Sequence, residues 1–241
     1  IGDAAHILWP FAGEGMCNGL RDASALTWRL DLVLQELAET TVLDSYESDR
    51  KPNMQGWTDL SREIGQPCII TDPEAAAQRD GFLQAVQQDP TLMPPPTIPP
   101  GPLAFSRDAD PLAGTPAVQG QVRDGDTVGL FDGVVGRGFQ LIAVDPAVFE
   151  NLDDANREFL TSIGAVIASV GDESATVRDE EGTYAGWFAG HGRAAVLARP
   201  DFWLFGSAAD AADVNALVTD LRAALNNSAW SADTEPASAV V

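Results

Sequence analysis

Apolar side chains at helical spacing mark two helices in the first third of the chain. The first stripe predicts a helix over about residues 16–39, buried along its apolar face. Its members are Met16, Leu20, Ala23, Leu26, Thr27, Leu30, Val33, Leu34 and Leu37. A second stripe predicts another helix and comprises Tyr46, Arg50, Met54, Trp57, Leu60 and Ile64. Because Pro52 lies within this second stripe, we expect that helix to be kinked or restarted there.

A third helix is expected before a proline-rich tract. Asp72 supplies a capping carboxylate, Pro73 suits the first helical turn, and Glu74 places an acid near the positive end of the helix dipole. This helix is expected to end at about Gln88. The prolines of residues 90–102 exclude helix and central strand there. The tract is interpreted as a semi-rigid linker, and a ligand for a proline-binding module is the alternative.

Beyond the linker, short apolar runs typical of strands are interrupted by two segments with apolar residues at helical spacing. The expected strands cover residues 127–131, 138–144, 165–170, 193–198 and 202–205, and the expected helices cover 153–163 and 214–225. The turn at residues 199–201 makes the last two strands a hairpin. This order predicts a small α/β domain of thioredoxin-like order. The small, polar tail is predicted to be disordered.

Composition narrows the class of protein. The 241 residues suffice for one or two domains, and the net charge of −22 argues against binding nucleic acid or an anionic membrane through a basic patch. No apolar run is long enough for a transmembrane helix, and the N-terminus does not have the pattern of a signal peptide. Cys17 and Cys68 form no CxxC pair, which favours a reducing cytoplasm. With His6 and His191 as the only histidines, no metal site is expected.

The first thirty residues carry the candidate chemistry. Their pattern predicts the end of a strand, a glycine-rich turn and the start of a long helix, where free N–H groups favour anions or polarised oxygens. Asp3 is suited to accept hydrogen bonds from a sugar or polyol hydroxyl, or else to cap the turn. Gly13 and Gly15 allow close backbone approach or belong to an ordinary loop. His6 and Cys17 are interpreted as packed rather than catalytic.

The combination of these residues resembles the second flavin-binding motif of the group A flavoprotein aromatic hydroxylases. The motif residues are Gly2-Asp3-Ala4-Ala5-His6, Pro10, Gly13-Glu14-Gly15-Met16, Asn18-Gly19 and Arg21-Asp22-Ala23. Within that family, Phe11–Cys17 and Asp72–Ala77 look most like 3-(3-hydroxyphenyl)propionate hydroxylases. The segment Gly192–Asp201 resembles the thioredoxin-like domain of phenol-hydroxylase-type members.

The resemblance implies a cofactor and a reaction. It implies FAD, with Asp3 on the ribityl chain, residues 13–18 along the flavin ring and Pro10 near the ring. The cofactor-binding residues that it implies are Gly2, Asp3, Pro10, Gly13, Gly15, Met16, Cys17 and Asn18. NADH or NADPH serves as reductant, O2 as oxidant and a small aromatic compound as substrate, a phenolic acid such as 3-(3-hydroxyphenyl)propionate. It names no catalytic residue in this chain.

The sequence also departs from the family pattern. Trp9 stands where many relatives have proline, and Cys17 where many have asparagine. The GxGxxG unit of the family is expected upstream of Ile1, so the chain is expected to be an inactive C-terminal fragment of the parent monooxygenase. Because the C-terminal domain has no CxxC, its expected role is structural or in a homodimer contact.

The predicted fold is mixed α/β. The expected domains are the C-terminal part of an FAD-binding monooxygenase domain (1–92), a linker (93–120), a thioredoxin-like domain (121–227) and a disordered tail (228–241). The alternative function is a non-catalytic interaction or dimerisation module that retains a remnant of the flavin motif.

Overall fold

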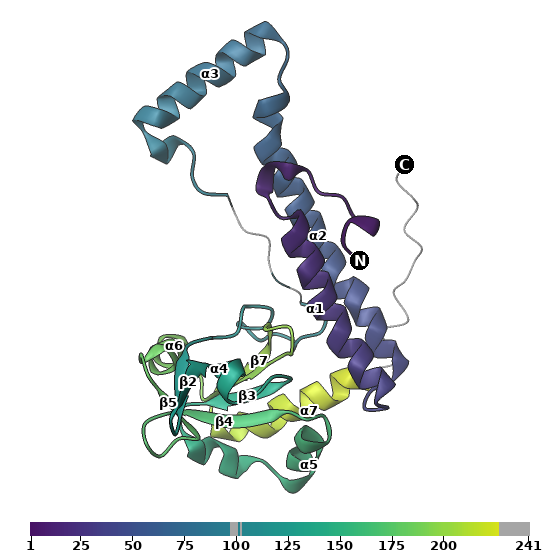
Figure 1. Ribbon diagram of the computed structural model, residues 1–241, viewed down its shortest axis with the longest axis vertical. Helices are drawn as coiled ribbons and strands as arrows, with labels where there is room; N and C mark the ends of the chain where they lie inside the picture. Colours follow the sequence, from purple (N-terminus) through teal and green to yellow (C-terminus); the bar gives the residue numbers. More distant parts are fainter. Residues whose placement is uncertain (97–100, 102, 227–241) are drawn as a thin grey trace. The chain divides into compact units, whose positions relative to one another are not determined.

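The computed structural model describes residues 1–96, 101 and 103–226 (Figure 1). The chain divides into two compact units. The first comprises Ile1–Ala23 and Arg50–Pro100, and the second comprises Ser24–Asp49 and Gly101–Val241. The predicted tail, 228–241, lies outside the described residues, and the predicted linker, 93–120, is described only in part.

Helices dominate the first unit, and two of them also contribute residues to the second. The helices are α1 (Gly15–Leu34), α2 (Asp44–Gly65) and α3 (Pro73–Gln88). Short 3₁₀ turns cover Gly2–Ala4, Pro10–Ala12, Thr40–Leu43, Gln66–Ile69 and Pro90–Leu92. The helix predicted after Asp72 is confirmed, and the Asp72 side chain accepts a hydrogen bond from the N–H of Ala75. Pro52 lies inside α2, which continues through it.

Two sequence predictions in this region were wrong. The expected strand end is a 3₁₀ turn, because Gly2 has a φ of +58° and its carbonyl accepts from the N–H groups of Ala5 and His6. Helix α1 ends at Leu34 and not near residue 39. It ends there because Glu36 adopts the left-handed region, with a φ of +59°.

The apolar stripe predicted for α1 is largely on the wrong face. Met16, Leu20 and Leu34 are 77%, 63% and 81% exposed. The face that is buried instead carries polar as well as apolar side chains, namely Asn18, Asp22, Ala25, Trp28, Arg29 and Leu32. The polar members of this face have hydrogen-bond partners, which is what makes their burial tolerable.

A mixed sheet forms the centre of the second unit and confirms the α/β class. Its strand order is β2-β1-β5-β4-β3-β6-β7. Strands β3, β4 and β5 are parallel neighbours, and the other pairs are antiparallel. The strands are β1 (Gln121–Asp124), β2 (Thr127–Leu130), β3 (Gln140–Ala143), β4 (Val166–Gly171), β5 (Val177–Asp179), β6 (Ala195–Ala198) and β7 (Leu204–Ala208).

Helices cover both faces of this sheet, and a separate cluster of buried apolar side chains lies on each face. The helices are α4 (Phe131–Val134), α5 (Asp154–Ser162), α6 (Thr183–His191) and α7 (Val214–Leu225). Successive side chains of β3 point to opposite faces: Leu141 belongs to the cluster that includes α5 and α7 residues, and Ile142 to the cluster that includes Tyr184 and Phe188 of α6. Figure 1 shows helices α5 and α7 next to each other.

The C-terminal hairpin and the closing helix are confirmed as elements. Strand β7 begins at Leu204 and not at Phe202, because Phe202 has a φ of +64° and still belongs to the turn. Strands β1 and β5 and helix α6 were missed, since both strands have at most four residues and α6 contains two glycines. The thioredoxin-like assignment stays a prediction, and the order β3-α5-β4-β5-α6-β6-β7-α7 supports it apart from the additional strand β5.

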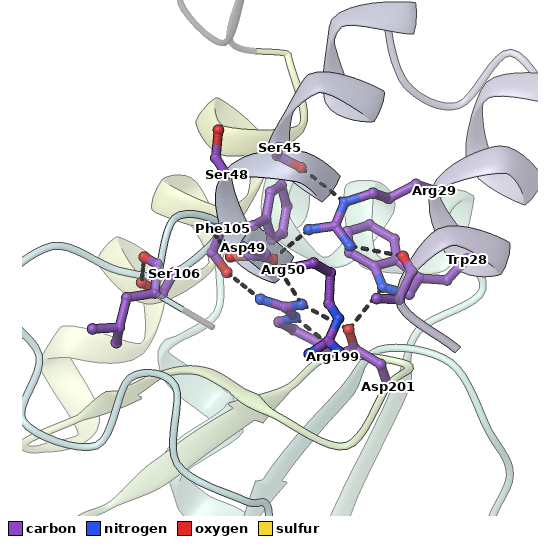
Figure 2. A network of polar contacts seen from close by, with 12 residues as sticks. Trp28, Arg29, Ser45, Ser48, Asp49, Arg50, Phe105, Ser106, Arg199 and Asp201 are labelled. Atoms are coloured by element: carbon purple, nitrogen blue, oxygen red, sulfur yellow. Dashed lines mark hydrogen bonds and ion pairs between the residues drawn. The ribbon is translucent and has the colours of Figure 1, made fainter. Parts of the chain in front are cut away.

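Four buried charged side chains, which we call the ionic cluster, lie in the second unit. They are Arg29, Asp49, Arg199 and Asp201, which Figure 2 shows pointing toward one another. Asp49 Oδ2 lies 2.5 Å from Arg29 Nη2 and 3.0 Å from Arg199 Nη2. Arg199 donates two hydrogen bonds to Asp201, of 2.9 and 2.6 Å. The cluster therefore links α1, α2 and the β6–β7 turn.

Backbone and aromatic groups complete the surroundings of the ionic cluster. The N–H of Phe105 donates to Asp49 Oδ1 over 2.9 Å, and the indole N–H of Trp28 donates to Asp201 over 3.2 Å. Burial, and then repulsion from Arg199, lower the pKa of Arg29 to about 10. Each charge thus depends on its partners, because an unpaired charge at such a position is strongly unfavourable.

Replacing Asp49 by Ala should destabilise the second unit strongly. It would leave Arg29 and Arg199 buried without the carboxylate between them, which should lower the free energy of unfolding by about 3–5 kcal/mol. Urea unfolding followed by circular dichroism measures the change. The control Glu150→Ala removes one negative charge from an exposed side chain and should cost less than about 0.5 kcal/mol. A similar effect of both variants would contradict a structural role for the cluster.

Candidate functional site

The turn that carries Asp3 is held against the start of α1. The N–H of Gly2 donates to Asp22 Oδ2 over 2.9 Å, and His6 Nε2 lies 2.6 Å from the same oxygen. A Cβ on Gly19 would lie 3.6 Å from Gly2 Cα, so the two backbones are in close contact. The turn therefore lies beside the first turns of the helix.

Asp3 itself is exposed on this turn. Within the described part of the chain, its carboxylate has no hydrogen-bond or ion-pair partner. Its position follows from the backbone of the turn, which Asp22 holds through Gly2 and His6, and its oxygens are available to a ligand hydroxyl.

Asp22 is the centre of a buried polar group. Arg50 donates through Nε to Asp22 Oδ1 over 2.8 Å, through Nη1 to Asn53 over 2.6 Å and through Nη2 to Asn18 over 3.0 Å. Burial by itself raises the pKa of Asp22, but the hydrogen bonds from Gly2, Arg50 and His6 outweigh it, and the net shift is downward. Asp22 is therefore a stable carboxylate.

Helix α2 holds the loop that contains Pro10. The hydroxyl of Ser61 donates to the carbonyl of Trp9 over 2.5 Å and accepts from the N–H of Ala12 over 3.4 Å. The ring of Phe11 lies against Gly65, where an added Cβ would come within 2.1 Å of the ring. The loop is thus attached to α2 by one buried hydroxyl and by one position without a side chain.

The loop then enters α1 through two glycines. Gly13 has a φ of +67°, which favours glycine, and Gly15 is the first residue of the helix. An added Cβ at either position meets nothing within 4 Å among the described residues, so there is space over this backbone. Glu14 is paired with Arg21 over 2.6 Å, which neutralises the one acid in the loop.

The structure places the predicted site residues in two groups on the first unit. Gly2, Asp3 and Asn18 come together around Asp22, whereas Pro10 and Gly13 share the loop held by Ser61. Met16 is 77% exposed and Cys17 is half-buried in the first turn of α1, next to Gly15. The assignment of these residues to a cofactor stays a prediction.

Sequence reasoning missed the side chains that support these two groups. They are Asp22, Arg50, Asn53 and Ser61. Asp22 was part of the motif, and Arg50 was counted in an apolar stripe because of its spacing. The available signal was two opposite charges on buried faces of neighbouring helices.

Other classes of site find no support in the described part of the chain. Among those residues, no group of three or more His, Cys, Asp or Glu side chains could hold a metal ion. No helix within the described ranges is long and apolar enough to span a membrane. Cys17 and Cys68 are free thiols.

Two protein families match the chain. Residues 1–61 match the family described as FAD binding domain, and residues 114–224 match the HcaD C-terminal domain. The first match contains all the predicted cofactor-binding residues, and the second contains the whole sheet.

Curated relatives cover most of the chain. A "probable NADH-specific resorcinol 4-hydroxylase" of Rhodococcus jostii (strain RHA1) is 36% identical over 93% of this chain and 42% of its own length. A 3-(3-hydroxy-phenyl)propionate/3-hydroxycinnamic acid hydroxylase of Burkholderia vietnamiensis (strain G4 / LMG 22486) is 29% identical over 83% of this chain and 42% of its own length. The chain thus spans less than half of each relative, which fits a fragment.

Solved structures share the fold. The flavin-dependent monooxygenase PieE, in complex with FAD and substrate, has a TM-score of 0.67 at 22% identity and covers 93% of this chain and 47% of its own. Aklavinone-11 hydroxylase, with FAD and aklavinone, has a TM-score of 0.62 at 23% identity and covers 93% of this chain and 42% of its own. The match to the FAD binding domain family and the curated hydroxylase relatives confirm the resemblance drawn from the first thirty residues.

The lowered pKa of Asp22 predicts how stability depends on pH. The folded state binds its proton less tightly than the unfolded state, whose pKa is about 3.9. The stability that Asp22 contributes is therefore present above about pH 4 and is lost as the pH falls through the folded-state pKa. Asp22→Asn should be less stable than wild type at pH 7, and the difference should shrink toward pH 3.

Urea unfolding at pH 7, 5, 4 and 3 measures this effect. Asp31→Asn removes an exposed carboxylate from the same helix and is the control that should follow the wild-type curve. A constant difference between wild type and Asp22→Asn across this range would show that the ionised form of Asp22 is not what stabilises the fold.

Proposed function

We propose that this chain, which is homologous to FAD-dependent aromatic hydroxylases over 93% of its length, supplies the flavin-ring part of such an enzyme. The observation that carries the proposal is Asp3, an exposed carboxylate without a partner among the described residues, on a turn bonded to the start of α1. The match of residues 1–61 to the FAD binding domain family supports the proposal, because that range contains the turn and the start of α1.

The residues fit a flavin in three respects. The Asp3 carboxylate is free to accept from ribityl hydroxyls. The backbone of Gly13 and Gly15 is open, since an added Cβ there meets no described atom within 4 Å. The first N–H groups of α1 have no acceptor inside the helix, so they are suited to polarised oxygens of the flavin ring. We assign cofactor binding to Gly2, Asp3, Pro10, Gly13, Gly15, Met16, Cys17 and Asn18.

The chain's own task in the reaction is to orient and to shield. When bound, FAD would carry two electrons from NADH or NADPH to O2, so that one oxygen atom enters the aromatic ring and the other leaves as water. Ser61 and Gly65 hold the loop with Pro10 in one conformation, so its backbone would present a fixed surface to a bound flavin. Trp9 and Phe11, the neighbours of Pro10 in the chain, have ring centroids 6.0 Å apart and are each 37% exposed, so their rings would form part of the shield around a flavin bound at this loop.

The proposed substrate is a small phenol. The names of the relatives support it, because one is called a resorcinol hydroxylase and the others act on 3-hydroxyphenyl acids. The higher identity to the resorcinol enzyme makes resorcinol the first compound to test, and 3-(3-hydroxyphenyl)propionate the second.

The C-terminal domain has a supporting role in this proposal. We assign residues 1–92 to the FAD-binding domain, 93–120 to a linker and 121–227 to a thioredoxin-like domain that provides a homodimer contact. Because the thiols of Cys17 and Cys68 are both free, the cytoplasm is the proposed compartment.

A non-catalytic interaction module is the rival function. Exposed apolar side chains of α1, such as Met16 and Leu20, would suit either a neighbouring domain of the hydroxylase or a partner protein. Stoichiometric FAD in the purified full-length protein and NADH oxidation that depends on a phenol support the enzyme, whereas a flavin-free protein supports the module.

Asp3→Ala in the full-length hydroxylase should weaken FAD retention about tenfold or more, because it removes a charged acceptor of ribityl hydroxyls. Flavin absorbance of the purified protein and fluorescence titration of the apoprotein measure the change. Asp31→Ala removes an equally exposed carboxylate and should retain wild-type FAD content. If Asp3→Ala lowers thermal stability but binds FAD normally, Asp3 is a structural residue and its assignment is wrong.

A further inference from the structure

The buried carboxylate of Asp22 binds the chain both before and after Asp3. Asp22 is 1% exposed, and its Oδ2 atom accepts from the N–H of Gly2 and from the imidazole of His6. Gly2 directly precedes Asp3 in the chain, and His6 follows three residues later. The two contacts therefore bracket the residue whose own side chain has no partner in the described part of the chain.

The turn between these contacts is short and closed. The carbonyl of Gly2 accepts from the N–H of Ala5 over 2.8 Å and from the N–H of His6 over 3.0 Å. The positive φ of Gly2 fixes the direction in which the chain leaves that residue. With both ends of the turn attached to one carboxylate, Asp22 fixes the backbone of the turn and with it the direction of the Cα–Cβ bond of Asp3.

Arg50 makes this carboxylate a fixed point. It binds the other oxygen of Asp22 and also the side chains of Asn18 and Asn53, and it is only 4% exposed. Its positive charge compensates the buried negative charge of Asp22. Asp22 cannot rotate away from the turn without breaking this pair.

We propose that Asp22 is a positioning residue for FAD, which acts through Gly2 and His6 to direct the Asp3 carboxylate at the ribityl chain. This proposal rests on the proposed function. It goes beyond it because Asp22 touches no cofactor: its effect on FAD affinity must pass through Asp3. A residue that only stabilises the fold would act on FAD affinity independently of Asp3.

A double-mutant cycle in the full-length hydroxylase separates these two roles. The variants are Asp3→Ala, Asp22→Asn and the double variant, and the quantity is the FAD dissociation constant of the apoprotein from flavin fluorescence. Asp22→Asn keeps the size of the side chain but weakens its bonds to Gly2, His6 and Arg50. It should raise the dissociation constant about tenfold. The double variant should bind FAD no more weakly than Asp3→Ala alone.

His6→Ala is the second test if Asp22→Asn does not fold. The His6 side chain is 20% exposed, so water is able to replace it at low cost to stability. The His6→Ala change should weaken FAD binding severalfold in the wild-type background and have no effect in the Asp3→Ala background. Arg62→Ala, at an exposed ion pair on α2, is the matched control and should not change FAD affinity in either background.

The outcomes distinguish the inference from the proposed function. If wild type binds no FAD, both are overturned. If wild type binds FAD and Asp3→Ala binds it as tightly, the assignment of Asp3 and the positioning role of Asp22 are overturned, but the flavin-binding function is not. If Asp3→Ala weakens binding but Asp22→Asn and His6→Ala do not, only the positioning role is overturned. If the two single changes raise the dissociation constant of FAD by factors that multiply in the double variant, the positioning role is also overturned, because Asp22 would then act independently of Asp3.

Discussion

The pairing of buried charges between α1 and α2 is the interaction on which the rest of the structure depends. In the first unit, Asp22 of α1 pairs with Arg50 of α2, and in the second unit Arg29 of α1 pairs with Asp49 of α2. In the first pair α1 supplies the acid and α2 the base, and in the second pair α1 supplies the base and α2 the acid. Helices that pair in this way have one register, since a shift by one turn would leave each charge buried without its partner.

Charged residues on a buried face also explain where sequence reasoning failed. Helix capping at Asp72 and the helical spacing of Val214, Leu217 and Leu221 are local signals, and both elements were predicted well. For α1, the apolar pattern favoured the face with Met16, whereas the buried face is defined by partners on α2. Pairing between distant segments is not visible in local periodicity.

The candidate site shows the same division between local and distant information. The motif pointed to the loop residues and to Asp3, because their types and order resemble a flavin-binding motif, and the match to the FAD binding domain family includes them. It assigned no role to Asp22, and Ser61 stands far downstream of the glycines that it supports. The residues proposed to touch the cofactor lie close together in sequence, and those that orient them come from both helices.

The β6–β7 turn imposes an order on how the chain folds. Arg199 and Asp201 complete a cluster that begins with Trp28 and Arg29, about 170 positions earlier in the chain. During synthesis, Arg29 and Asp49 leave the ribosome long before their C-terminal partners, whereas Asp22 and Arg50 are only 28 residues apart. The first unit is therefore able to close early, and the second must wait for the last hairpin. A polypeptide that stalls before residue 199 would expose the incomplete cluster to chaperones and proteases.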